Sequence, residues 1–325
     1  MTDPHRLPGE ISVPDIGVGT WAWGDRGVWG MGGYDSTLTE ATIAEAWEAS
    51  IDAGATFFDT AEVYGNGESE RIIGRLLAAD PGRAAKAVIA TKFMPVPWKF
   101  DVVGSLRRAL EASLGRLGVG SVALYQIHGP ISLRGHAHLA DALAAVHEDG
   151  LVGAVGVSNY SAKEMRSIAR ELAERGIQLA TNQIEFSLLR RRPESNGLLA
   201  ACRELGVLPL AYSPLGQGRL TGKYDAEHPP PKGRSFSNHP MVEVDAIVNT
   251  LRELGGAHDR TPSQVALQWI VSKGVVPIPG AKNRLQAEQN AGGMGWSLTE
   301  EELTRLDNVA LEGTNDLRNR FWQHG

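Results

Sequence analysis

The chain has 325 residues, of which 42% are hydrophobic and 22% are charged, and its formal net charge is −6. This composition is typical of a globular protein, and the scattered basic residues argue against a nucleic-acid partner. An apolar signal segment and a membrane-length apolar run are both absent from the sequence, so we expect a cytoplasmic protein with no membrane partner. The single cysteine, Cys202, cannot form an intramolecular disulfide and is expected in the core.

Short apolar runs alternate with amphipathic stretches at nearly constant spacing, which is the pattern of repeated strand–helix units around a parallel sheet. Several runs lack polar alternation, as expected for strands that are buried on both faces. Eight strands are predicted, at residues 16–20, 55–60, 87–92, 122–128, 152–158, 179–186, 207–213 and 275–279. With no linker to divide residues 1–325, we expect an α/β fold with one (β/α)8 TIM barrel.

The expected helices carry apolar residues every three or four positions, together with recognisable end signals. Ser161 and Glu164 form a capping box, and Thr261 followed by Pro262 opens another helix. Gly118 and Gly206 each stop a helix just before a strand. The predicted helices lie at residues 38–53, 68–79, 101–117, 139–147, 162–174 and 196–205, with 242–254 and 263–273 as extra helices before the last strand and 284–290 and 300–309 after it.

Two segments depart from the repeat. Residues 225–240 contain the run Pro229-Pro-Pro231 and are expected to form a mobile loop. The tail at residues 314–325 is polar up to Phe321 and Trp322, which we expect to fold back onto another part of the molecule.

The run from Gly17 to Ala22 fits a loose dinucleotide fingerprint, but no helix pattern follows it, so a Rossmann site is not expected.

Polar residues stand at the carboxyl ends of three successive predicted strands. Asp59 ends the second strand and Tyr64 follows it by five residues, while Lys92 ends the third strand and His128 the fourth. Singly, these could be a turn-forming aspartate, a lysine reaching solvent and a histidine capping a turn. Because catalytic residues of a barrel lie at the carboxyl ends of its strands, their joint occurrence favours a catalytic site.

These four side chains suit carbonyl reduction. Asp59 can pair with Lys92, which makes a semi-buried lysine tolerable. The Lys92 cation is expected to lower the pKa of the Tyr64 phenol from its reference value of about 10, as a general acid requires. His128 can orient the substrate carbonyl. Ligand spacing for zinc is absent from the sequence, so no metal is expected.

The order of Asp59, Tyr64, Lys92 and His128 resembles the catalytic tetrad of the aldo/keto reductase superfamily, and the likeness runs from Gly17 to Asn290. The segment from Tyr212 to Tyr224 is most similar to the branch with bacterial reductases, plant pyridoxal reductases and potassium-channel β subunits. The resemblance implies NADPH/NADP+ as cofactor and a small-molecule aldehyde or ketone as substrate. It leaves the oligomeric state open.

The resemblance also assigns cofactor contacts. Ser158, Asn159 and Gln183 correspond to residues that bind the nicotinamide carboxamide, and hydroxyl and amide groups can recognise an amide. Tyr212 corresponds to the ring on which the nicotinamide stacks. Backbone N–H groups from Ser213 to Leu220 are expected around the pyrophosphate. The further assigned residues are Thr20, Trp21 and Asp59 at the pocket, Leu215 and Gly218 in the pyrophosphate segment, and Lys223 and Arg234 as phosphate cations.

The last strand leads into the segment that the resemblance assigns to the adenosine phosphate, at a helix N-terminus where an anion is favoured. Its expected contacts are Gly280, Lys282, Gln286, Gln289 and Asn290. Many family members carry Arg where Gln286 stands and Glu where Gln289 stands. Lys282 and the nearby Arg284 can supply positive charge, and no acid occupies the place of a 2′-hydroxyl reader, so we expect NADPH to be preferred over NADH.

Two other functions compete with a reductase. One is an NADPH-binding regulatory subunit that resembles the channel β subunits and turns over slowly, although little sequence precedes the barrel. The other is a barrel lyase or isomerase acting on phosphorylated sugars, which would leave Asp59, Tyr64 and Lys92 without roles. The aromatic residues that can line an apolar substrate pocket are Trp21, Trp23, Trp29, Trp98, Phe321 and Trp322.

Overall fold

The computed structural model describes residues 5–24, 38–231, 239–314 and 323–325. Part of the predicted mobile loop and most of the predicted tail lie outside these residues. The same holds for four residues that the sequence singled out, namely Trp29, Arg234, Phe321 and Trp322.

Eight strands form one sheet in the order β10-β9-β8-β7-β6-β5-β4-β3, and each neighbouring pair is parallel. The amide of Gly17 donates to the carbonyl of Pro277 at 2.9 Å and that of Gly19 to Pro279 at 3.0 Å, which joins the first strand to the last. The predicted (β/α)8 barrel is therefore confirmed. The strands are β3 (Val18–Gly19), β4 (Phe57–Asp59), β5 (Val88–Phe93), β6 (Val122–Ile127), β7 (Val152–Ser158), β8 (Leu179–Glu185), β9 (Leu208–Tyr212) and β10 (Val276–Pro277).

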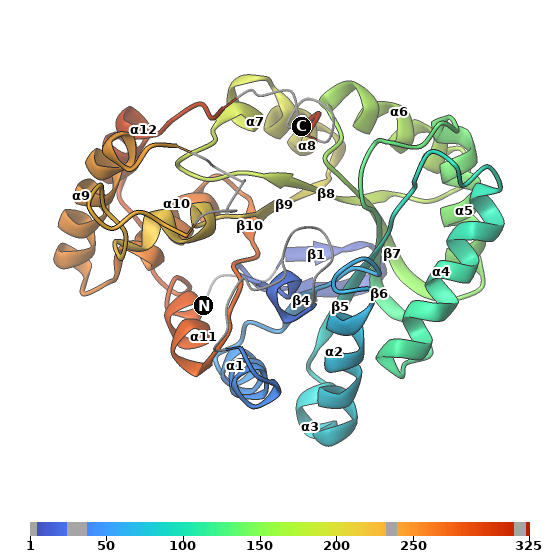
Figure 1. Cartoon of the computed structure of the whole chain (residues 1–325). Coiled ribbons are helices and arrows are strands. Elements are labelled where there is room, and N and C mark those ends of the chain that lie inside the picture. The colour runs from blue at the N-terminus through green and yellow to red at the C-terminus, as the bar shows by residue number, and fades with distance from the viewer. Residues whose placement is uncertain (1–4, 25–37, 232–238, 315–322) are drawn as a thin grey trace.

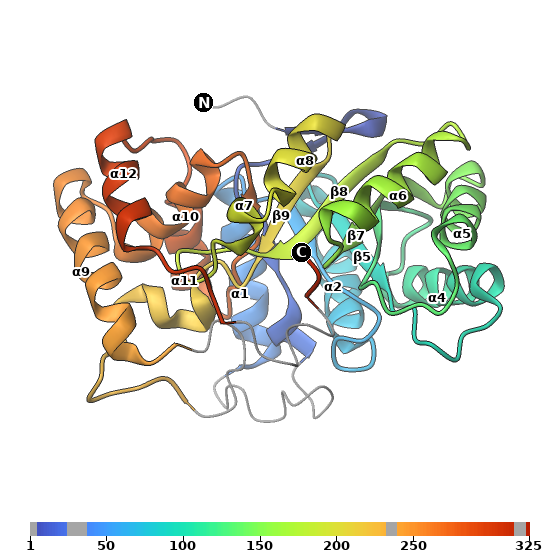
Figure 2. The same cartoon turned by 90° about the horizontal axis from the view of Figure 1, so that it is seen from above.

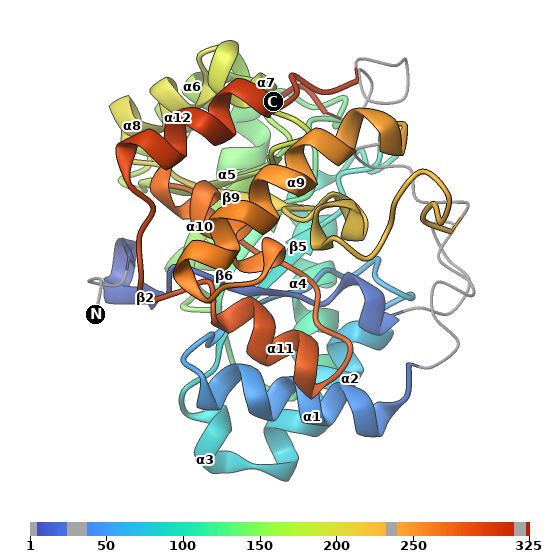
Figure 3. The same cartoon turned by 90° about the vertical axis from the view of Figure 1, so that its left-hand side faces the viewer.

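Helices follow one another around the outside of the sheet (Figure 1). The helices expected beyond the basic repeat are also present, and three of them, α9, α10 and α12, pack side by side (Figure 3). The helices are α1 (Glu40–Asp52), α2 (Glu68–Ala79), α3 (Pro81–Ala84), α4 (Val102–Leu117), α5 (His136–Glu148), α6 (Ala162–Ala173), α7 (Arg192–Ser195), α8 (Leu198–Leu205), α9 (Met241–His258), α10 (Pro262–Ser272), α11 (Arg284–Ala291) and α12 (Glu300–Val309). None that the described residues form is both long and apolar enough to cross a bilayer.

The predicted end signals act as expected. The Ser161 hydroxyl accepts from the amide of Glu164, whose carboxylate accepts from the amide of Ser161 in return. Gly118 and Gly206 have φ values of 67° and 65°, a left-handed conformation that glycine adopts without the Cβ penalty, and end α4 and α8. Cys202 is fully buried in α8, as predicted.

The core has two layers. Apolar side chains of the strands fill the barrel interior, and a larger cluster fills the space between the strands and the helices. An N-terminal hairpin of β1 (His5–Leu7) and β2 (Ile11–Val13) lies at one end of the barrel (Figure 2), where Leu7 and Val13 join the interior cluster. The sequence did not predict this hairpin, because strands of three residues are too short to show a period.

Candidate active site

Asp59 and Lys92 form a buried ion pair at the carboxyl ends of β4 and β5. The Lys92 ammonium lies 2.5 Å from Asp59 Oδ2, and the two side chains are 0% and 2% exposed respectively. Lys92 Nζ also donates to the carbonyl oxygen of Thr60 at 2.8 Å. An ammonium buried to this degree is stable only with such partners, so the position of the lysine is fixed by the barrel itself.

Tyr64 reaches the same ammonium from the turn after β4. Lys92 Nζ donates to Tyr64 Oη at 3.1 Å and lies 4.9 Å from the centre of its ring. The backbone around Tyr64 packs directly on Gly24, where a Cβ would come 2.6 Å from the Tyr64 carbonyl carbon. A larger residue than glycine would therefore displace the phenol.

His128 completes the predicted tetrad. Its backbone amide donates to the carbonyl of Phe93 at 2.8 Å. This bond holds the residue after β6 beside the end of β5. The imidazole meets the Tyr64 ring edge to face, with ring centres 5.6 Å apart and planes at 75°. The structure thus brings together all four residues that the sequence selected from three different strands.

The electrostatics of the cluster differ from the prediction in one respect. Burial raises the pKa of Tyr64 above its ordinary value, and the Lys92 charge opposes this only in part. The expectation that the cation would leave the phenol with a lowered pKa is therefore wrong, because the desolvation of a buried side chain is not apparent from sequence. Tyr64 keeps its proton at neutral pH.

Lys92 and His128 respond to burial in opposite ways. Burial by itself would lower the pKa of Lys92, but the charges and hydrogen bonds of Asp59 and Tyr64 outweigh it and hold the pKa above its ordinary value. For His128, burial and the nearby Lys92 charge both act against the cation, so its pKa lies well below the ordinary value. The site therefore holds a charged lysine and a neutral histidine.

Two amides hold the second oxygen of Asp59. Gln183 Nε2 donates to Asp59 Oδ1 at 2.8 Å from β8, and Gln126 Nε2 donates to the same atom at 3.1 Å from β6. The prediction included Gln183 as a carboxamide contact but missed Gln126. A buried glutamine inside an otherwise apolar strand is the signal that could have revealed it.

Ser158, Asn159 and Tyr212 lie in one chain of hydrogen bonds at the ends of β7 and β9. Asn159 Nδ2 donates to Ser158 Oγ at 3.1 Å, and Tyr212 Oη donates to Asn159 Oδ1 at 2.8 Å. Asn159 and Ser213 both have left-handed backbones, with φ of 64° and 50°. Such strain in non-glycine residues is typical of functional sites.

Residues near the end of the chain also contact Tyr212 and Asn159. Gln323 Nε2 donates to Tyr212 Oη at 2.8 Å and to Glu185, and the amide of His324 donates to the carbonyl of Asn159 at 3.1 Å. Phe321 and Trp322, which we expect to fold back, lie outside the described residues, whereas Gln323 and His324 contact the barrel here. No sequence pattern indicates that Gln323 and His324 contact Tyr212 and Asn159.

The predicted pyrophosphate segment is a tight turn containing the 3₁₀ helix η3 (Gly216–Thr221). The amides of Gly216, Gly218 and Leu220 donate to carbonyls within this turn, so these three are engaged in the structure. Arg219, which the prediction omitted, is buried here and donates to the carbonyl of Gly216. Lys223 is exposed, with its ammonium 4.8 Å from the centre of the Tyr224 ring.

The predicted adenosine segment lies at the N-terminus of α11. Gln286 Oε1 accepts from the amide of Lys282 at 3.0 Å, and Asn290 Nδ2 donates to the carbonyl of Gly280 at 3.2 Å. These two side chains thus stabilise the turn before α11. Gln289 is half-buried on the helix, and Gly280 is exposed.

The remaining residues predicted at the pocket differ in burial, both in the segment after β3 and in the loop after β5. Thr20 is buried and its hydroxyl donates to the carbonyl of Asp59 at 3.0 Å, whereas Trp21 is half-buried at the start of the 3₁₀ helix η2 (Trp21–Gly24). Trp23 is 3% exposed and donates to the carbonyl of Ala281 at 2.7 Å, so its expected place in a substrate pocket is wrong and its role is packing. Trp98 is 72% exposed.

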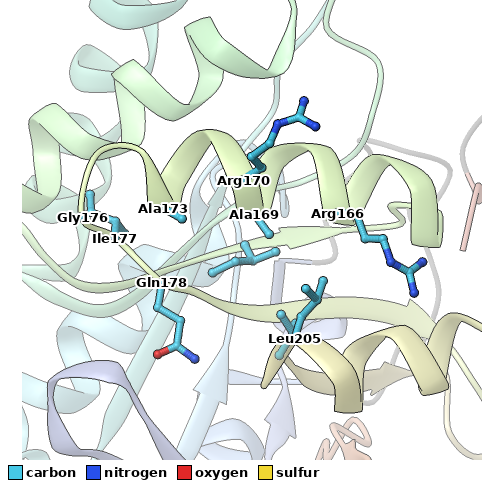
Figure 4. Close-up of a pocket in the computed structure, with 10 residues that line it drawn as sticks. Arg166, Ala169, Arg170, Ala173, Gly176, Ile177, Gln178 and Leu205 are labelled. Carbon is cyan, nitrogen blue, oxygen red and sulfur yellow. The ribbon is translucent and has the colours of Figure 1, made fainter.

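A groove of about 470 Å³ lies elsewhere, between α6 and α8 (Figure 4). It is lined by residues that precede or begin β8 and β9, such as Gln178 and Val207, at the opposite ends of the strands from the tetrad. Arg166 on its rim pairs with Glu204 at 2.6 Å. None of the four tetrad residues lines this groove.

Comparisons with known proteins identify the family of the chain. The sequence profile of the aldo/keto reductase family matches residues 15–311. Pyridoxal reductase of Arabidopsis thaliana chloroplasts is 36% identical, over 97% of this chain and 88% of its own length. The structure of a glycerol dehydrogenase from Gluconobacter oxydans covers 98% of this chain and 99% of its own, at 32% identity and a TM-score of 0.82.

A third relative has been solved with a cofactor. The structure of an aldo-keto reductase from Klebsiella pneumoniae in complex with NADPH covers 97% of each chain, at 26% identity and a TM-score of 0.76. Fold and relatives together define an oxidoreductase built on a (β/α)8 barrel. The chain belongs to the aldo/keto reductase family.

Proposed function

We propose that this protein reduces an aldehyde or ketone to an alcohol with NADPH, and that Tyr64 is the general acid. The observation that carries the proposal is the Lys92 ammonium, which is within hydrogen-bonding distance of both Asp59 and Tyr64. A regulatory subunit with slow turnover is not favoured, because the relatives named above are a reductase and a dehydrogenase.

The nicotinamide cofactor supplies the hydride when it is bound. As the carbonyl oxygen gains electrons, Tyr64 donates its phenolic proton to that oxygen, and the phenolate that remains is stabilised by the Lys92 ammonium. Asp59 keeps Lys92 charged and in place. In the alcohol-oxidising direction the phenolate of Tyr64 acts as the base.

His128 is suited to orientation rather than to proton supply. Its lowered pKa leaves it neutral over the working pH range, and a neutral imidazole can donate one hydrogen bond to the substrate carbonyl. Its edge-to-face contact with Tyr64 supports a site in which both groups would meet one carbonyl oxygen. Two donors to one carbonyl oxygen would polarise it for reduction.

The wall of Ser158, Asn159 and Gln183 fits a carboxamide. Gln183 Nε2 already donates to Asp59, so its Oε1 is the atom that would accept from the carboxamide NH2. Tyr212 Oη is tied to Asn159 and Gln323, which fixes the ring that would stack on the nicotinamide. The left-handed backbones at Asn159 and Ser213 support a binding role for this wall.

We assign the preference for NADPH over NADH to Lys282, which lies just before the N-terminus of α11. Arg284 is a weaker candidate, because its guanidinium lies 3.5 Å from Glu48 and 3.7 Å from Glu288. Gln286 braces Lys282 through the backbone amide of that residue. The helix N-terminus adds a further preference for an anion.

The test is an NADPH-oxidation screen against aldehydes and ketones that includes pyridoxal, glyceraldehyde and dihydroxyacetone. We expect at least one of these compounds to be reduced, and we expect Tyr64→Phe to bind NADPH normally but to turn over about 10²- to 10⁴-fold more slowly. Wild-type turnover in Tyr64→Phe would remove Tyr64 from the mechanism.

A further inference from the structure

A second polar layer crosses the barrel interior beside the tetrad. Lys92 on β5 is in register with Gln126 on β6, Gln126 with Gly156 on β7, and Gly156 with Thr181 on β8. The register of β7 against β8 shifts at Gly156, and such irregularities are frequent next to active sites. Gln126 and Thr181 are fully buried.

Because Gly156 has no side chain, the side chains of Gln126 and Thr181 can occupy the space beside it. A Cβ at this position would lie 2.1 Å from Thr181 Oγ1 and 3.1 Å from Gln126 Cγ. Only glycine is therefore compatible with this arrangement. The Gln126 side chain extends across the barrel interior to Asp59 on β4, two strands away in the sheet.

The orientation of the Gln126 amide is set by its neighbours. Thr181 Oγ1 donates to Gln126 Oε1 at 3.4 Å, which directs the amide nitrogen toward Asp59 Oδ1 at 3.1 Å. With Gln183 on the same oxygen, Oδ1 receives two amide donors, and Oδ2 is the oxygen that meets Lys92. A buried amide without partners is costly, so this contact fixes the rotamer of Asp59.

We propose that Gln126 is a positioning residue for the reaction: oriented by Thr181 and accommodated by Gly156, it holds Asp59 so that Lys92 is presented to Tyr64. The inference rests on the acid role of Tyr64 proposed above. Gln126 acts through Asp59 and makes no contact with the reacting atoms.

Four ionisable groups of the described residues face Tyr64: Asp59 on β4, Lys92 on β5, His128 after β6 and Tyr212 on β9. His128 and Tyr212 are uncharged at neutral pH, because burial lowers the pKa of the first and raises that of the second. Asp59 and Lys92 therefore set the charge at the phenol. Removing an amide donor leaves the Asp59 charge less compensated, which makes the phenolate less favourable.

The experiment measures pH–rate profiles for reduction and oxidation in Gln126→Leu. We expect kcat to fall about tenfold with little change in KM, and the rise of the oxidation rate to move by about one unit toward alkaline pH, since one pKa unit is a tenfold change in the ionised fraction. Thr181→Val should shift the profile in the same direction but less. Gln268→Leu changes a buried glutamine on α10 in the same way and should leave the profile unchanged.

Gln126→Glu separates positioning from packing and also serves if Gln126→Leu does not fold. At acid pH the protonated carboxyl can donate to Asp59 as the amide does, so reduction should stay near the wild-type rate, and activity should fall as that carboxyl ionises. A packing role predicts the reverse, with Gln126→Leu fully active at all pH values. That outcome, with Tyr64→Phe inactive, would overturn the inference alone, whereas an active Tyr64→Phe would overturn the proposed function.

Discussion

The strongest physical prediction concerns the buried pair of Asp59 and Lys92. Each side chain is almost fully withdrawn from water and the charged atoms are 2.5 Å apart. Removing one partner of such a pair leaves an uncompensated charge and costs about 3–5 kcal/mol. We therefore expect Asp59→Asn and Lys92→Met each to lower the free energy of unfolding by an amount in this range.

The contacts that remain around the unpaired charge decide which variant has the larger loss of folding free energy. In Lys92→Met the carboxylate keeps two amide donors, Gln126 and Gln183. In Asp59→Asn the ammonium keeps, among the described residues, the neutral oxygens of Thr60 and Tyr64. Asp59→Asn should therefore be the less stable variant, and the double variant should recover part of the loss because no buried ion remains.

Urea unfolding monitored by circular dichroism measures these differences. Because the folded-state pKa of Lys92 is raised, the stability it contributes is fully present below its unfolded pKa of about 10.4 and is lost only as pH climbs through the folded value. The difference between wild type and Lys92→Met should thus be constant from about pH 6 to pH 9. Single variants within about 1 kcal/mol of wild type, the range of an exposed pair, would refute the reasoning.

Three further outcomes follow from the site. Reduction should decline at alkaline pH as Tyr64 loses its proton, while oxidation rises through the same apparent pKa; coincident profiles would count against a tyrosine acid. His128→Gln should raise KM and lower kcat but keep this alkaline limb, which rate profiles in both directions would show; a lost limb would make His128 the acid. Lys282→Ala should weaken binding of NADPH at least tenfold more than that of NADH, as measured by fluorescence titration; equal losses would contradict the phosphate assignment.

The tetrad could be predicted because its signal is local. Asp59, Lys92 and His128 each end an apolar run, and parallel strands bring such ends to one rim. Predicting that these side chains lie together required no knowledge of strand register or loop shape. The same holds for the capping box at Ser161 and for the left-handed glycines that end helices.

What the sequence missed depends on contacts between distant segments. Gln126 becomes significant only when register places Gly156 and Thr181 beside it. The docking of Gln323 on Tyr212 joins residues 111 positions apart, and no pattern in either segment indicates it. Trp23 shows the converse, since a loop tryptophan near a site can as easily pack against a neighbouring loop as line a pocket.

The pKa of Tyr64 could be predicted only in part. The sequence correctly supplied Lys92 as a neighbouring cation that stabilises the phenolate. It could not weigh that charge against the burial of the phenol, which is the larger effect. The balance of the two depends on how deeply the folded chain buries the phenol beside Lys92.

The most direct test of the account is single-turnover reduction with NADPH already bound, comparing wild type with Tyr64→Phe on a carbonyl substrate found in the screen. The account predicts unchanged NADPH affinity and a rate of cofactor oxidation lower by about 10²- to 10⁴-fold in the variant. Equal rates of cofactor oxidation in the two proteins would contradict it.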